Sequence, residues 1–254
     1  MESMATTLEN LKACFHEYEE PKEDGNGGCP KCDGSGLIKI NRNGQIVIRY
    51  CSVCEQKQAN RRYLKQSGIS KSDYEKYSFK TFKIETEETK KMKDIAYGFI
   101  EDKTAKGMGV FGKSGTGKTH ICIATCQEMN MSHLYWQYRT EIQRLKNCMY
   151  KDYGRYDELI SKAKNAKCLY IDDLFKGAMK KELNGNVVIQ EQDLQIMFDI
   201  INNRYIKSGI KTIVSSEFTL NEIFKADEAI GGRIYEMVNK YALKLDGKNR
   251  RLTL

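Results

Sequence analysis

Residues 112–119 read Gly-Lys-Ser-Gly-Thr-Gly-Lys-Thr and match the pattern G-x-x-x-x-G-K-[ST] at every fixed position. Glycines suit a loop whose backbone N–H groups all turn inward toward an anion such as a triphosphate. A helix expected to begin near Lys118 would direct the positive end of its dipole at the same phosphates. The pattern predicts that the lysine reaches the β and γ phosphates and that the last threonine binds Mg²⁺. The predicted nucleotide-binding residues are Gly112, Lys113, Ser114, Gly115, Thr116, Gly117, Lys118 and Thr119.

A second candidate site element is an apolar strand that ends in two acids, Cys168-Leu-Tyr-Ile-Asp172-Asp173. It ends 54 residues after Lys118. Alone such a run is weak, because many surface strands end in acids. Combined with the glycine-rich loop, it predicts that Asp172 holds Mg²⁺ through water and that Asp173 polarises the attacking water as general base.

An ATP-hydrolysing site of this kind also needs a sensor of the γ-phosphate and often an arginine from a neighbouring subunit. The third apolar strand, Thr212-Ile-Val-Ser-Ser216-Glu217, ends in polar groups at the position expected for the sensor. Arg233 follows two glycines and is expected at an exposed turn, where the alternative is a solvated charge.

Strand-like and helix-like segments alternate from Gly107 onward, which predicts an α/β domain with a parallel sheet covered on both sides. One apolar helix face is expected from Leu194, Met197, Phe198, Ile201 and Tyr205. The expected strands are 109–111, 133–138, 168–171, 212–215 and 242–245, and the expected helices are 118–130, 140–150 and 191–207.

Two close cysteine pairs near the start of the chain, Cys29-x-x-Cys32 and Cys51-x-x-Cys54, are separated by 18 residues. Strands expected over 37–40 and 46–50 lie between them and are joined by turn-forming residues. Two such pairs around a hairpin are typical of a zinc ribbon, a closed structural site with four thiolate ligands. An iron–sulfur cluster or a redox pair would leave the hairpin unexplained. The remaining five cysteines are expected to be buried as small hydrophobes.

Charge divides the N-terminal part of the chain. Residues 1–28 carry seven acids against two lysines, a net of −5, and residues 29–84 carry a net of +8. A helix expected over residues 4–19 either packs on its own domain or binds a partner. The basic stretch after the ribbon either contacts nucleic-acid phosphates or is a solvated linker helix. The predicted division is an acidic helix (1–28), a zinc ribbon (29–54), a basic linker (55–76) and an ATPase domain (77–254).

Composition narrows the class of protein. The 254 residues include 42 Lys and Arg against 34 Asp and Glu, a formal net charge of +8, and 40% are hydrophobic. The sequence has no run of 18 apolar residues and no secretory signal. We therefore expect a cytoplasmic globular protein without membrane association.

With these motifs in this order, the chain resembles bacterial and phage replicative helicase loaders of the DnaC/DnaI type, which are AAA+ ATPases. The resemblance runs from about Tyr77 to the end of the sequence and implies an AAA+ core without a separate helical lid. Besides the 112–119 loop and the Gly-Gly-Arg233 segment, it rests on Tyr77-Ser-Phe-Lys-Thr-Phe82, Ile171-Asp-Asp-Leu174, Ile201-Asn-Asn-Arg-Tyr205, Thr212–Glu217 and Gly247-Lys-Asn-Arg-Arg251.

The resemblance implies further roles. Arg233 falls where these loaders carry an arginine finger that acts on the ATP of the adjacent subunit, so the protein would self-associate through the ATP site. Arg251 matches the arginine that reads the nucleotide of its own subunit, and two aromatics, Phe79 and Phe82, would help form the wall near the adenine. Ser-Ser-Glu stands where Thr-Ser-Asn is more usual, which leaves open whether Ser216 or its neighbour Glu217 is the sensor. An Asp at position 173, rather than Glu, implies modest turnover.

The expected function is loading of a replicative DNA helicase hexamer onto single-stranded DNA, with ATP, Mg²⁺ and zinc as cofactors. The N-terminal region would hold the helicase. DNA contacts are expected near Arg139, Arg144 and Lys146, with Tyr135 and Tyr138 available for stacking. A transposition helper ATPase is one alternative, although such helpers usually carry a helical N-terminal region instead of a ribbon. A nucleotide-binding adaptor without useful hydrolysis is another.

Overall fold

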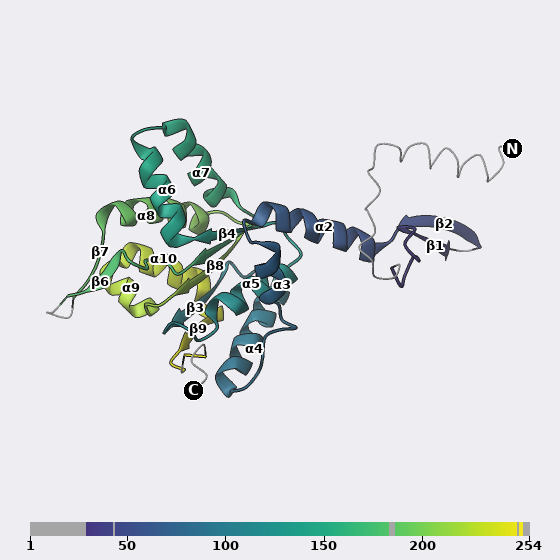
Figure 1. Ribbon diagram of the computed structural model, residues 1–254, viewed down its shortest axis with the longest axis horizontal. Helices are drawn as coiled ribbons and strands as arrows, with labels where there is room; N and C mark the ends of the chain where they lie inside the picture. Colours follow the sequence, from purple (N-terminus) through teal and green to yellow (C-terminus); the bar gives the residue numbers. More distant parts are fainter. Residues whose placement is uncertain (1–28, 43, 183–185, 248, 251–254) are drawn as a thin grey trace. The chain divides into compact units, whose positions relative to one another are not determined.

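The computed structural model describes residues 29–42, 44–182, 186–247 and 249–250 of the chain (Figure 1). It separates into two compact units, Met1–Glu55 and Gln56–Leu254. The helix expected over residues 4–19 lies outside the described residues. The boundaries expected at residues 28, 54 and 76 stay predictions.

The first unit contains an antiparallel hairpin of β1 (Leu37–Arg42) and β2 (Gln45–Tyr50). The connecting turn forms as its sequence predicts, because the Asn41 side chain accepts a hydrogen bond from the Gly44 N–H at 2.9 Å and Gly44 takes a φ of 80°. Every residue of β2 is exposed, including Ile46 and Tyr50 at about 60%. The hairpin therefore buries little apolar surface of its own.

The second unit is α/β, as expected. Its sheet consists of the strands β3 (Gly107–Gly112), β4 (His133–Gln137), β5 (Cys168–Asp172), β8 (Lys211–Ser216) and β9 (Ala242–Leu245). The long helices are α4 (Glu87–Glu101), α5 (Lys118–Glu128), α6 (Tyr138–Met149), α7 (Tyr153–Asn165), α8 (Glu191–Ile206) and α10 (Glu228–Val238). The shorter elements are α3 (Lys71–Lys76), α9 (Leu220–Ala226), the 3-10 turn η1 (Asn239–Tyr241) and the small hairpin of β6 (Met179–Lys181) and β7 (Val187–Ile189). Helix α2 (Ser52–Ser67) begins before the boundary between the units, and with α3 it covers most of the stretch expected to be a basic linker.

The five strands pair in the order β4-β5-β8-β3-β9, and every pairing is parallel. All carboxyl ends therefore lie at one edge, where Gly112 ends β3 and Asp172 ends β5, with β8 between these two strands. In open parallel sheets this edge is where ligands bind.

Successive residues of the central strands face opposite sides of the sheet and enter two separate cores. Leu169 and Ile171 of β5 join a core with helices α6–α8 and α10, whereas Cys168 and Tyr170 join a core with α4 and α5. Figure 1 shows the two helical layers on either side of the sheet. The single tryptophan, Trp136 of β4, is 3% exposed in the first core.

Two sequence-based expectations need correction. Tyr138 does not end the second strand; it begins α6 and is buried. The buried face of α8 also differs from the expected apolar stripe, because it contains Asp193 and Arg204, whereas Phe198 is 38% exposed. Both polar residues are buried because they have internal hydrogen-bond partners, which a pattern of apolar residues does not register.

Helix α7 and the β6–β7 hairpin were not expected from the sequence. Among the described residues, no helix combines the length and apolarity needed to cross a membrane.

Candidate functional site

The 112–119 loop leaves β3 at Gly112 and enters α5 at Lys118, as its motif predicts. Gly112, Gly115 and Gly117 have φ values of 130°, 79° and 98°, which residues with a side chain rarely adopt. A Cβ on Gly112 would also lie 2.0 Å from the Leu245 carbonyl oxygen. The backbone thus has the shape that an anion-binding loop requires.

The Lys118 side chain lies inside this loop and is 5% exposed. Its ammonium donates to the carbonyl oxygens of Gly112 and Lys113, at 2.7 and 2.8 Å. Burial lowers the pKa of Lys118, while the carboxylates of Asp173, Glu217 and Asp172 act in the opposite direction. A buried ammonium bonded to its own loop carbonyls fits a site for phosphate.

Asp172, 5% exposed at the end of β5, receives hydrogen bonds from four hydroxyl groups. Thr119 donates at 3.1 Å, Tyr135 at 2.9 Å and Ser215 at 2.7 Å, and Tyr170 donates as well. Burial raises the pKa of Tyr170 well above its ordinary value, so this hydroxyl stays a donor. The structure therefore brings together the two residues predicted to hold Mg²⁺, Thr119 and Asp172, and their oxygen chemistry fits that ion.

Asp173 follows at a left-handed φ of 55°, and its N–H donates to the Ser215 hydroxyl at 3.2 Å. The Lys176 ammonium lies 2.9 Å from an Asp173 carboxylate oxygen and 2.9 Å from one of Glu217. This lysine was missed by sequence reasoning. The available signal was a cation three residues after the paired acids.

Of the two sensor candidates, Glu217 is the one whose pKa is influenced by residues of the glycine-rich loop, Lys118 and Ser114. Burial raises its pKa, but the Lys176 hydrogen bond and charge, together with Lys118 and Ser114, bring the pKa below its ordinary value. Ser216 is fully buried and donates to the Leu174 carbonyl at 2.8 Å.

An aromatic cluster borders the loop at Gly117. Phe82 is 5% exposed and packs edge-on against His120, with ring centroids 5.1 Å apart. A Cβ on Gly117 would lie 3.7 Å from the Phe82 ring. Phe79 instead stacks on Tyr97 at 4.6 Å. Of the two predicted wall aromatics, Phe82 is thus the one placed beside the loop.

Arg251 lies outside the described residues, but its neighbour Arg250 lies at the loop. The Arg250 N–H donates to the Gly115 carbonyl at 2.9 Å. Its guanidinium pairs with Glu85 at 2.8 Å and lies 5.9 Å from the centre of the Phe82 ring.

Arg233 lies within helix α10, not at an exposed turn, which corrects that expectation. Its guanidinium donates to Asn202 at 2.9 Å and to the Ala229 carbonyl at 2.7 Å, and lies over the Phe198 ring at 5.0 Å. Of the two preceding glycines, Gly231 serves helix packing, because a Cβ there would lie 2.4 Å from the Phe224 Cα of α9, whereas a Cβ on Gly232 would make an ordinary contact at 3.9 Å.

The four cysteines of the first unit converge. The sulfur atoms of Cys29, Cys32, Cys51 and Cys54 all lie within 4.8 Å of one another. Two of the separations, Cys29–Cys51 and Cys32–Cys54, are 3.7 and 3.5 Å. Sulfurs in tetrahedral zinc sites lie about 3.8 Å apart. A hydrogen bond from the Lys31 backbone lowers the pKa of Cys29 to about 7, whereas the hydrogen bond with Cys32 raises the pKa of Cys54 to about 12. A bound metal would displace the protons that these thiols share. The cluster fits zinc.

Several of the residues expected to contact DNA are buried or already paired within the protein. Lys146 forms an ion pair with Asp193, whose side chain is 2% exposed, and Tyr138 is buried. The Tyr135 hydroxyl is engaged by Asp172. Arg139 is exposed, and Arg144 pairs with Glu141 on the surface.

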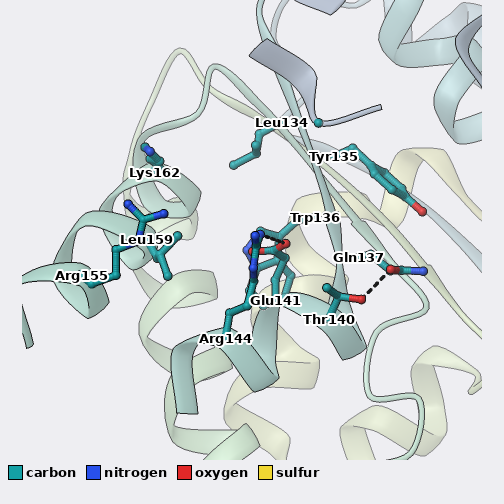
Figure 2. Close-up of a pocket in the computed structure, with 11 residues that line it drawn as sticks. Leu134, Tyr135, Trp136, Gln137, Thr140, Glu141, Arg144, Arg155, Leu159 and Lys162 are labelled. Atoms are coloured by element: carbon teal, nitrogen blue, oxygen red, sulfur yellow. Dashed lines mark hydrogen bonds and ion pairs between the residues drawn. The ribbon is translucent and has the colours of Figure 1, made fainter. Parts of the chain in front are cut away.

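A cavity of about 390 Å³ lies between β4 and the α6–α7 pair. Its apolar lining includes Leu134 and Trp136 of the strand. Figure 2 shows Arg155 and Lys162 on one helix and Arg144 on the next, around this cavity. Arg144 pairs with Glu141, and both Arg155 and Lys162 pair with Glu158, so the phosphates of a nucleotide strand would compete with these carboxylates for the cations.

Comparisons with known proteins were made for sequence and structure. No protein-family model matches the sequence. The phage-like element PBSX protein XkdC of Bacillus subtilis (strain 168) is 29% identical over 231 residues, covering 86% of this chain and 82% of the relative.

Three solved replication proteins share the fold. The DnaC helicase loader matches with a TM-score of 0.57 at 20% identity, over 70% of this chain and all of that one. DnaI matches with a TM-score of 0.56 at 20% identity, over 73% and 96%. The replication initiator DnaA, bound to AMPPCP and single-stranded DNA, matches with a TM-score of 0.51 at 18% identity, over 69% and 51%. The expected resemblance and the AAA+ fold with its five-stranded parallel sheet are confirmed.

Proposed function

We propose that this chain, whose core has the fold of the DnaC and DnaI proteins, is an ATP-dependent DNA replication factor that loads a replicative helicase hexamer onto single-stranded DNA. The observation that carries the proposal is the hydrogen bond between Thr119 and Asp172, at 3.1 Å, which joins the glycine-rich loop to the acidic strand end. A metal-bound triphosphate needs both of these elements at one point. The XkdC relative, from a phage-like element, supports a loader of the phage type.

ATP binds with its phosphates in the 112–119 loop, and Lys118 turns from the loop carbonyls to the β and γ phosphates. The hydroxyl of Thr119 and the carboxylate of Asp172 hold Mg²⁺, which neutralises phosphate charge when bound. Phe82 borders the adenine. Arg250, whose N–H donates to the Gly115 carbonyl of the loop, is with Arg251 a candidate for direct contact with the nucleotide.

Hydrolysis uses Asp173, whose carboxylate accepts a proton from the attacking water, and the neighbouring strand end with Ser216 and Glu217 reports on the γ-phosphate. Arg233 of an adjacent subunit stabilises the transferring phosphoryl group, so the active assembly forms by self-association through the ATP site. To act in this way, Arg233 must leave Asn202 and the Phe198 ring.

Partner binding is divided along the chain. Residues 1–54, with the ribbon cysteines holding zinc as a structural metal, dock on the helicase. The cavity with Arg144, Arg155 and Lys162 contributes to a path for single-stranded DNA. Because the contacts are with phosphates, DNA affinity falls steeply with added salt.

The test is co-purification with a replicative helicase hexamer in the presence of ATP or ADP, followed by mass measurement of the complex. The full chain, a chain lacking residues 1–54 and the Lys118→Ala variant are compared. We expect nucleotide-dependent association that requires residues 1–54 and is lost with Lys118→Ala.

Absence of association with the helicase in either nucleotide would contradict the loader. Association with a transposase instead would identify a transposition helper. Association without ATP turnover, even with DNA and helicase present, would identify an adaptor.

A further inference from the structure

Lys176 lies in a turn of fixed backbone that directly follows the acidic end of β5. Leu174 and Phe175 of this turn are fully buried, and the Leu174 N–H donates to the Ser215 carbonyl at 2.8 Å. The Lys176 N–H donates to the Asp173 carbonyl at 3.0 Å, which closes the turn. The position of the lysine is therefore set by packing and backbone hydrogen bonds.

The ammonium group of Lys176 bridges two carboxylates from neighbouring strand ends. It lies 2.9 Å from Asp173 and 2.9 Å from Glu217, and its side chain is 41% exposed. Since an ammonium has three N–H donors, these two carboxylates do not exhaust its hydrogen-bonding capacity. A further acceptor can thus approach from solvent.

This bridge adjoins the glycine-rich loop. The Asp173 N–H donates to the Ser215 hydroxyl at 3.2 Å, and that hydroxyl donates to Asp172 at 2.7 Å. Asp172 in turn accepts from Thr119 of the loop at 3.1 Å. The carboxylates of Asp173 and Glu217 also act to raise the pKa of Lys118. Lys118 is the residue expected to meet the β and γ phosphates. The Lys176 ammonium is therefore on the side of the site where the terminal phosphate would lie.

The charge at this end of the site favours a further cation beside Lys118. Asp172, Asp173 and Glu217 place three carboxylates around this end of the site, where a γ-phosphate adds further negative charge. A glutamate at the sensor position would repel that phosphate, since like charges at short range disfavour each other. Because Lys176 pairs with Glu217, the group that faces the phosphate at this position is a positive ammonium instead of a negative carboxylate.

We propose that Lys176 is the residue by which this site distinguishes ATP from ADP: its ammonium group, oriented by Asp173 and Glu217, donates to the terminal phosphate of ATP. The proposal rests on the proposed function, because it requires ATP to bind in the 112–119 loop. It assigns Glu217 the role of positioning the lysine.

The experiment measures the dissociation constants of ADP and of the non-hydrolysable analogue AMPPCP, both with Mg²⁺, for the full chain. The variants are Lys176→Met, which removes the charge, and Lys176→Arg, which keeps it. Lys180→Met, a change at an exposed lysine of β6, is the matched control. Thermal unfolding of each variant without nucleotide verifies that it folds.

We expect Lys176→Met to weaken AMPPCP binding about ten- to hundredfold, the effect of losing a hydrogen bond to a charged group. ADP binding should change by less than about fivefold, the range for an exposed ion pair. Lys176→Arg should retain most of the preference for AMPPCP, and Lys180→Met should behave as wild type.

Equal loss of both nucleotides in Lys176→Met, or no loss of either, would overturn the role of Lys176 while leaving nucleotide binding itself intact. If the unaltered chain binds neither nucleotide, the proposed function fails, and this inference fails with it.

Discussion

Asp173 carries the proton-accepting role in the proposed chemistry, and its backbone conformation suggests a clean substitution. Its φ of 55° lies in the left-handed region, which asparagine tolerates about as well as aspartate. Asp173→Asn should therefore preserve the turn while removing the base. We expect ATP turnover to fall about 10²- to 10⁴-fold with nucleotide affinity retained, as measured by phosphate release and by equilibrium binding.

Asp157→Asn, at an exposed position of α7, is the control for this substitution. Turnover that survives Asp173→Asn would remove the assignment of the base.

The residues around Asp172 show which parts of the site could be predicted from the sequence. The glycine-rich loop and the acidic pair were predictable because their residue types are set by phosphate and metal chemistry. Tyr170 could have been added, since alternate residues of a strand share a face and Tyr170 lies two positions before Asp172. The contact from Ser215 could not, because this residue reaches Asp172 from the adjacent strand end. For Lys176, which contacts Asp173, the sequence offers only a cation three residues after the acids, and its position depends on a turn whose φ values no motif specifies.

Among the elements, α8 is joined to the sheet by a buried arginine. Arg204 is 1% exposed and donates to the carbonyls of Ala163, Ala166 and Lys211 and to the Thr212 hydroxyl. Burial lowers its pKa to about 10, so it remains charged at neutral pH.

Arg204→Met should lower the free energy of unfolding by at least about 3 kcal/mol, because each buried acceptor left without a donor costs roughly 1–3 kcal/mol. Denaturant titration would measure the change, with Arg139→Met, at an exposed position of α6, as control. A loss no larger than that of Arg139→Met would contradict this account.

The two glycines before Arg233 illustrate the limit of sequence reasoning for an element. A glycine pair favours a turn, yet here Gly231 permits α10 to approach α9 closely. Asp227 caps the start of α10 through the Ile230 N–H at 2.7 Å, a helix-start signal that precedes the glycines. The close approach depends on where α9 lies, which the local sequence does not specify.

The ribbon gives a second prediction for an element. Its buried apolar residues are chiefly the cysteines themselves, so its folding should depend on the metal. We expect about one zinc per chain by metal analysis. A chelator should increase the reactivity of the ribbon thiols while nucleotide binding by the core persists. A folded, metal-free hairpin with protected thiols would contradict the prediction.

For the whole molecule, the trans role proposed for Arg233 predicts complementation between two variants that are each expected to be inactive. Arg233→Ala keeps its own base but lacks the finger, and Asp173→Asn has the reverse defect. Mixed in equal amounts, they should recover about a quarter of the wild-type turnover, because head-to-tail association pairs an intact base with an intact arginine at about that fraction of interfaces.

Turnover of the mixture is compared with that of each variant alone at the same total concentration. If the mixture is no more active than its components, Arg233 does not act across subunits, and its contacts with Asn202 and Phe198 are structural.

The buried position of Trp136 has a practical consequence for spectroscopy. As the only indole in the sequence, it lies in the core of Gln56–Leu254, and the ribbon segment contains none. The fluorescence emission of Trp136 should therefore follow unfolding of the Gln56–Leu254 unit and should not change when the ribbon opens. Trp136 fluorescence can thus report unfolding of one unit independently of the other, without an added label.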